Sequence, residues 1–119
     1  KNNVKKAELK QKIIDELLNQ NTDEITKNYL AECYNCKAFE YSKDSDYSNA
    51  HKSIDKAISM RPDNVNFYNS KGEILLMQGK NDEALKMWKK VLELKPNFLD
   101  GYPDGTNLSN ELKKLGLIK

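Results

Sequence analysis

Two adjacent stretches decide the fold: residues 31–64 read AECYNCKAFEYSKDSDYSNAHKSIDKAISMRPDN, and residues 65–98 read VNFYNSKGEILLMQGKNDEALKMWKKVLELKPNF. Each is 34 residues long, and placing Pro62 over Pro96 aligns them without a gap. Similar residues then recur at matching positions: Tyr34 with Tyr68, Ala38 with Gly72, Tyr41 with Leu75, Ala50 with Ala84, Ile54 with Trp88, and Ala57 with Val91. A fixed period of this length indicates a repeat protein.

The spacing within each unit predicts two antiparallel helices. Large, small and large residues at unit positions 4, 8 and 11 fall on one face of a first helix. The small residue there, Ala38 or Gly72, lets a second helix approach closely. The proline at position 32, Pro62 or Pro96, ends that second helix because it cannot continue the hydrogen-bond ladder.

The residues between the predicted helices favour the same boundaries. Asp46 and Asn81 stand where the second helices should be N-capped, and Gly79 stands where a first helix should end. Asp63 and Asn64 follow a proline and can cap the next first helix.

This pattern resembles the tetratricopeptide repeat (TPR) family, over 68 of the 119 residues. The resemblance implies an all-α, TPR-like α-α superhelix of about six antiparallel helices, whose first helices line a concave groove for a protein ligand. One subset of the family binds acidic chaperone tails through a carboxylate clamp of Lys, Asn and Arg. Here Asn35, Phe39 and Ser70 occupy clamp positions and a third repeat is absent, so we do not expect a chaperone-tail adaptor of that type.

Two repeats bury too little surface for independent stability, so the flanks should complete a single domain over residues 1–119. Residues 1–30 are expected to hold a capping helix over 4–19 and, after an N-cap at Thr22, the start of an extended first helix. The capping helix has an apolar stripe formed by Val4, Ala7, Ile13, Ile14, Leu17 and Leu18. Residues 99–119 should hold a turn and a last capping helix over 106–115.

In TPR-like folds, unit positions 2, 5, 6, 9, 12 and 13 usually face the groove. Carried over, these positions predict a ligand groove lined by Asn35, Phe39, Ser42, Asn69, Glu73, Leu76 and Met77. Apolar residues on such a face indicate contact with a ligand, and repeated asparagines can hydrogen-bond a peptide backbone. Two alternatives stay open: the flanking helices fold over the apolar residues, and the asparagines form a solvated face.

Unit position 7, commonly Leu in the family, is Lys37 in the first unit and Lys71 in the second. The simpler interpretation is that each stem lies along the hairpin with its ammonium in water. The functional alternative is a cationic rail for an acidic ligand.

Charge and cysteine content exclude other classes. The net charge is +2 and Arg61 is the single arginine, which argues against nucleic-acid binding. No apolar run is long enough to span a membrane. Cys33 and Cys36, with His51 as the single histidine, cannot make a four-ligand zinc site, and a CxxC in mid-helix is a poor redox motif.

We therefore predict a protein-protein interaction module that binds a peptide or partner in the groove, with no cofactor, no metal and no enzymatic activity. The alternative is a structural or self-assembling segment of a longer TPR array or multidomain protein. The sequence begins with Lys1 rather than Met, so we expect a truncated N-terminus. Two unpaired cysteines favour a reducing compartment such as the cytoplasm.

Overall fold

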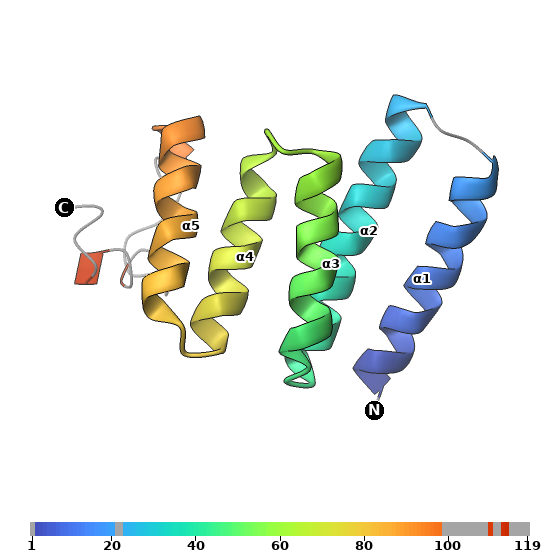
Figure 1. Cartoon of the computed structure of the whole chain (residues 1–119), viewed down its shortest axis with the longest axis horizontal. Helices are drawn as coiled ribbons and strands as arrows, with labels where there is room; N and C mark the ends of the chain where they lie inside the picture. Colours follow the sequence, from blue (N-terminus) through green and yellow to red (C-terminus); the bar gives the residue numbers. More distant parts are fainter. Residues whose placement is uncertain (1, 21–22, 99–109, 111–112, 115–119) are drawn as a thin grey trace.

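The computed structural model describes residues 2–20, 23–98, 110, 113 and 114. In these ranges the chain forms five α-helices and no strand. They are α1 (Asn2–Gln20), α2 (Glu24–Lys43), α3 (Tyr47–Met60), α4 (Val65–Met77) and α5 (Asn81–Leu94) (Figure 1). The all-α, TPR-like class is confirmed. Most of the predicted last helix, 106–115, lies outside the described residues.

Consecutive helices pack against one another and alternate in direction, from α1 at one end of an elongated array to α5 at the other (Figure 1). α2 and α4 also contact each other, although α3 lies between them in the sequence. These two helices open the 34-residue units, and they run in the same direction (Figure 1). The chain therefore has a face built from the first helices of both units.

The residues that recur between the units form the core. Ala38, Ala50, Ile54 and Ala57 are fully buried in one cluster, which also receives Ile14 from α1. The counterparts of the last three, Ala84, Trp88 and Val91, form a second cluster between α4 and α5 together with Leu75, the counterpart of Tyr41. The period read from the sequence thus corresponds to two hairpins with matching interiors.

Three of the expected helix boundaries are confirmed. The Asp46 carboxylate accepts a hydrogen bond from the Asn49 backbone N–H and caps α3. The Asn64 side chain accepts one from the Asn66 N–H and caps α4. Gly79, with φ of +85°, follows α4 in the left-handed conformation that favours glycine.

Two predicted caps are wrong. Thr22 lies outside the described residues, and the N-cap of α2 is Asp23, whose Oδ1 accepts from the Thr26 N–H at 2.8 Å. Asn81 is the first residue of α5, not its cap. The cap position is Lys80, which makes no side-chain capping bond, because the turn after Gly79 brings the chain into the helix one residue earlier than expected.

Polar contacts to α2 hold α1 in place. Asp44, the C-cap residue of α2, accepts from the Val4 backbone N–H at 3.0 Å and from the Asn3 side chain at 3.2 Å. Near the middle of the helix, Lys10 pairs with Glu40 at 3.1 Å. The first turn of α1 is therefore capped by a residue some forty positions away.

The apolar stripe predicted for α1 is only partly inward. Ala7 and Ile14 are fully buried and Leu17 packs on the core, but 38% of Ile13 is exposed and Val4 is half-buried. The side chain of Leu18 lies outside the described residues.

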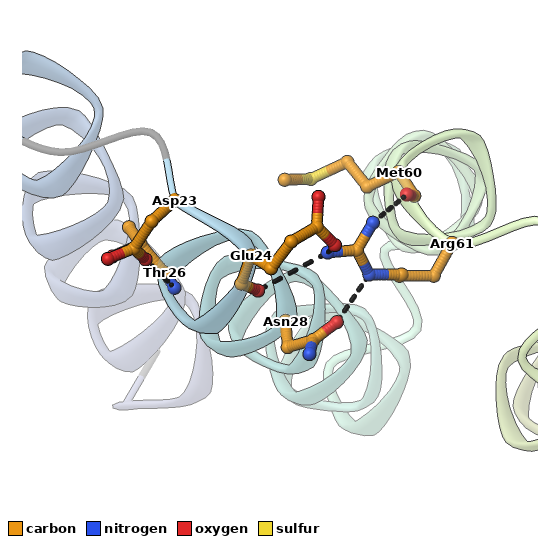
Figure 2. A network of polar contacts seen from close by, with 6 residues as sticks. All are labelled: Asp23, Glu24, Thr26, Asn28, Met60 and Arg61. Atoms are coloured by element: carbon orange, nitrogen blue, oxygen red, sulfur yellow. Dashed lines mark hydrogen bonds and ion pairs between the residues drawn. The ribbon is translucent and has the colours of Figure 1, made fainter.

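The single arginine joins the end of the first unit to the extension of α2 that precedes it. Arg61, the C-cap residue of α3, reaches across to the N-terminal turn of α2 (Figure 2). Its guanidinium pairs with the Glu24 carboxylate at 2.7 Å, donates to the Asn28 side chain, and donates to the Met60 carbonyl at 3.2 Å. The N-terminal extension of α2 is thereby tied to the end of α3.

Candidate functional site

The predicted groove residues all lie on α2 and α4, but several of them face the interior. Ser42 is 2% exposed, and its hydroxyl donates to the Ala38 carbonyl one turn earlier. Phe39 is half-buried and packs against the first core cluster, and Leu76 packs likewise against the second. Of the apolar groove candidates, Met77 is the most open, with half of its surface exposed.

Asn69 is engaged in a hydrogen-bonded network between α4 and α5. Its Oδ1 accepts from the Trp88 indole Nε1 at 3.1 Å, and its Nδ2 donates to the Glu73 carboxylate at 3.3 Å. Burial raises the pKa of Glu73, and the hydrogen bond from Asn69 partly offsets that rise. The Asn69 amide therefore orients neighbouring side chains within the chain.

Asn35 occupies the same unit position in α2, yet its surroundings differ. Its Oδ1 is buried and has no hydrogen-bond partner among the described residues. The residue that stands in the place of Trp88 is Ile54, which has no N–H to donate. The two asparagines are equivalent in sequence position but not in hydrogen bonding.

The two lysines at unit position 7 each face the preceding helix. Lys37 is only 8% exposed. Its ammonium donates a hydrogen bond to the side chain of Gln11 in α1. It also lies 5.4 Å from the ring centre of Tyr34 and 5.8 Å from that of Tyr41. Burial lowers its pKa, although the Asp15 carboxylate acts in the opposite direction. The Lys71 ammonium pairs with Asp55 of α3. Both ammonium groups therefore have partners within the chain, which gives the predicted cationic rail no support.

An apolar opening lies where the sequence did not predict it, between α1 and α2. This cavity of about 390 Å³, here called the α1–α2 cavity, is lined by Lys6, Leu9, Lys10, Ile13, Tyr29, Glu32, Cys33 and Cys36. Glu32 and Cys36 occupy unit positions 2 and 6, so the cavity adjoins the predicted groove at its N-terminal side. The signal in the sequence was the presence of apolar residues beyond those that the packing of the two helices buries: Leu9 and Ile13 of α1 and Tyr29 of α2.

The two cysteines face this cavity from the middle of α2. Cys33 is half-buried and Cys36 is exposed, and both are free thiols. Burial is the main factor that raises the pKa of Cys33. Because the thiolate is the reactive form, a raised pKa opposes redox chemistry at this pair.

A second cavity, of about 320 Å³, lies across α3, α4 and α5 and is mostly charged. It is lined by His51, Asp55, Lys71, Leu75, Lys80, Glu83, Lys86 and Met87. The Nε2 atom of His51 lies 2.8 Å from the Gln78 side-chain oxygen. Two of its lysines pair with its own acids, Lys71 with Asp55 and Lys80 with Glu83.

No cluster of three or more metal-ligating side chains occurs in the part of the chain that the structure describes. None of the described helices combines the length and the hydrophobicity that crossing a membrane requires.

Comparison with known proteins identifies the repeat. Residues 65–98 match the family model for the tetratricopeptide repeat, with the boundaries expected from the sequence. Residues 65–98 are thus a tetratricopeptide repeat, and the hairpin of α2 and α3 resembles that repeat in its period, its core positions and its proline end.

Two curated proteins are similar to part of the chain. Protein STIP1 homolog of Dictyostelium discoideum is 42% identical over 71 residues, which are 60% of this chain and 12% of that protein. TPR repeat-containing protein MJ0941 of Methanocaldococcus jannaschii is 39% identical over 54 residues, which are 45% of this chain and 16% of that protein. The matches thus span less than a fifth of either relative. No solved structure matches significantly.

Proposed function

We propose that this chain is a protein-protein interaction module that binds a peptide or partner protein on the face formed by α2 and α4. The observation that carries the proposal is apolar surface left open on these first helices. Half of Met77 is exposed on α4, and Tyr29 and Cys36 are exposed on α2. Apolar side chains gathered on an exposed face favour contact with another molecule.

The family supports this function over catalysis. The repeat at 65–98 belongs to a family of interaction modules, and the curated relatives include another protein named for its TPR repeats. Glu73, which the Asn69 amide orients, supplies a polar group beside the apolar ones. A site of this composition recognises a segment by shape and by a few hydrogen bonds.

The expected contact residues are Phe39, Leu76 and Met77, with Glu73 as the polar neighbour. Phe39 and Leu76 contribute only their exposed edges, because the rest of each side chain packs on the core. Met77 can contribute most of its side chain. Binding should therefore depend more on Met77 than on Phe39 or Leu76.

The test is selection of random peptides on the wild-type chain, followed by affinity measurement on variants. Met77→Lys should weaken binding about tenfold or more, because a buried apolar contact is replaced by a charge. The double variant Phe39→Ala with Leu76→Ser should also lose binding, with circular dichroism verifying its fold. Leu94→Lys on α5, also an exposed apolar site, is the matched control. Unchanged binding by both groove variants would show that the face formed by α2 and α4 is not the binding site.

A further inference from the structure

Among the described residues, several exposed apolar side chains gather between α1 and α2. Leu9 and Ile13 of α1 are 60% and 38% exposed, and Tyr29 of α2 is 54% exposed. All three line the α1–α2 cavity together with the thiol groups of Cys33 and Cys36. An apolar cavity of this size on a small domain favours binding of another molecule there.

The internal repeat indicates what kind of molecule fits. The counterparts of Cys33 and Cys36 in the second unit are Phe67 and Ser70 of α4. Phe67 is 1% exposed and Ser70 is 7% exposed, and α4 packs against both α2 and α3. At the corresponding place in the first unit, α1 packs on α2 as α3 packs on α4. α4 has α2 beside it. At the equivalent place beside α2, the described part of the chain leaves an open cavity.

We propose that an amphipathic α-helix of a partner protein docks in the α1–α2 cavity, in the position relative to α2 that α2 itself holds relative to α4. This inference rests on the proposed function, and it specifies the kind of ligand and the position where it binds. The partner helix would run in the same direction as α2, as α2 and α4 do (Figure 1). Its apolar stripe would cover Leu9, Ile13 and Tyr29.

The charges around the cavity define the polar edges of that helix. On the α1 side stand Lys6, which is exposed, and Lys10, which already pairs with Glu40. On the α2 side stands the exposed Glu32. A partner helix with acidic residues along the edge facing α1 would satisfy Lys6, whereas a basic edge there would meet two lysines. Complementary charges of this kind set the orientation of a docked helix.

The probe is a synthetic peptide of about 18 residues with leucines at helical spacing and glutamates along one edge of the stripe. Fluorescence anisotropy measures its affinity for the wild-type chain, and circular dichroism measures its helicity on binding. Two further peptides serve as comparisons: one with lysines in place of the glutamates, and one with a central proline that prevents a continuous helix. The glutamate peptide should bind about tenfold or more tightly than either.

Variants then locate the site. Leu9→Lys should weaken binding of the glutamate peptide about tenfold or more, since it places a charge in the apolar cavity. Ile25→Lys is the control, because Ile25 is 82% exposed on α2 and does not line the cavity. In a Cys33→Ser background, the bound peptide should slow maleimide labelling of Cys36 several-fold, a readout that reports occupancy of the cavity directly.

Three outcomes would overturn the inference. They are equal binding of all three peptides, equal loss in the Leu9→Lys and Ile25→Lys variants, and unprotected Cys36 in the presence of bound peptide. Dimerisation of the wild-type chain that Leu9→Lys abolishes, with no peptide binding, would show a second copy as the occupant. If the helix peptides fail while Met77→Lys still reduces binding of selected peptides, this inference fails and the proposed function stands.

Discussion

The indole Nε1 of Trp88 donates a hydrogen bond to Oδ1 of Asn69 at 3.1 Å, linking α5 to α4. In the first unit the equivalent pair is Ile54 and Asn35, and Ile54 has nothing to donate, so Oδ1 of Asn35 is buried without a partner among the described residues. A buried polar group without a partner costs about 1–3 kcal/mol. One sequence position thus makes a hydrogen bond between helices in one repeat and leaves a buried acceptor without a described partner in the other.

The two asparagines should respond differently to alanine. Asn69→Ala leaves the Trp88 N–H unpaired and should lower the free energy of unfolding by about 1–2 kcal/mol. Asn35→Ala removes an unpaired acceptor and should be neutral or stabilising by up to about 0.5 kcal/mol. Urea unfolding followed by the fluorescence of the single tryptophan measures both. Both variants gain the same helix propensity, so equal effects would contradict the assigned hydrogen bond.

Gly72 should tolerate alanine only when Trp88 is smaller. A Cβ at Gly72 would lie 2.9 Å from Cε2 and Nε1 of Trp88, too close for a packed interior. Gly72→Ala should cost about 1–3 kcal/mol in the wild type, as overpacking typically does. In a Trp88→Ile background, which reproduces the Ala38 and Ile54 pair of the first unit, the same change should cost almost nothing. A double-mutant cycle from urea unfolding by circular dichroism would detect this coupling, and additive effects would refute it.

Ser45 should be improved by glycine. It follows α2 with φ of +60°, in the position that Gly79 takes after α4. The bonds from Ser45 N to Ser42 O and from Asp46 N to Tyr41 O close that helix end. Because a side chain strains this conformation, Ser45→Gly should raise the free energy of unfolding by about 0.5–1 kcal/mol. Gly79→Ser is the reciprocal control and should lower it by a similar amount. The measurement is thermal unfolding, and a Tm of the Ser45→Gly variant below that of the wild type would contradict the prediction.

Lys37→Met should stabilise the chain near neutral pH by about 0.5–1 kcal/mol, since replacing a buried charge by an apolar residue of similar volume removes its desolvation cost. Because burial lowers the folded-state pKa of Lys37 below its ordinary value of 10.5, the folded state binds fewer protons than the unfolded state between those two values. Wild-type stability therefore rises with pH across that interval, and the advantage of the variant should shrink.

The measurement is urea unfolding at pH 7 and at about pH 10. Lys71→Met is the matched control, because Lys71 is more exposed and pairs with the exposed Asp55, so the change should stay within about 0.5 kcal/mol. A Lys37→Met variant less stable than the wild type at neutral pH would show that the contacts with Gln11 and the two tyrosine rings outweigh desolvation.

Glu73→Gln should remove a pH-dependent weakness. Burial raises the folded-state pKa of Glu73 above 4.5, so stability falls as pH rises through the interval above that value. Gln can still accept from the Asn69 amide. The variant should be about 0.5 kcal/mol more stable than the wild type at pH 7, since partial exposure screens the charge, and nearly equal to it at pH 4. An unchanged difference between the two pH values would contradict the assignment.

Much of the fold followed from spacing alone. The period of 34, the small residues Ala38 and Gly72, and the terminal prolines predicted both hairpins and the extent of the repeat at 65–98. Helical periodicity is a local property, so it survives without knowledge of the tertiary structure. The caps were less reliable, because a shift of one residue in a turn moved the α5 cap from Asn81 to Lys80.

The sequence by itself determined the number, order and pairing of the helices in both repeats, because steric fit between small and large residues at fixed positions leaves few other arrangements. Only the tertiary structure decided how α1 sits on α2. That packing depends on Asp44 reaching the first turn of α1, and on Lys10 pairing with Glu40. No periodicity joins residues so far apart, so neither the burial of the Lys37 ammonium nor the open α1–α2 cavity could be predicted from spacing.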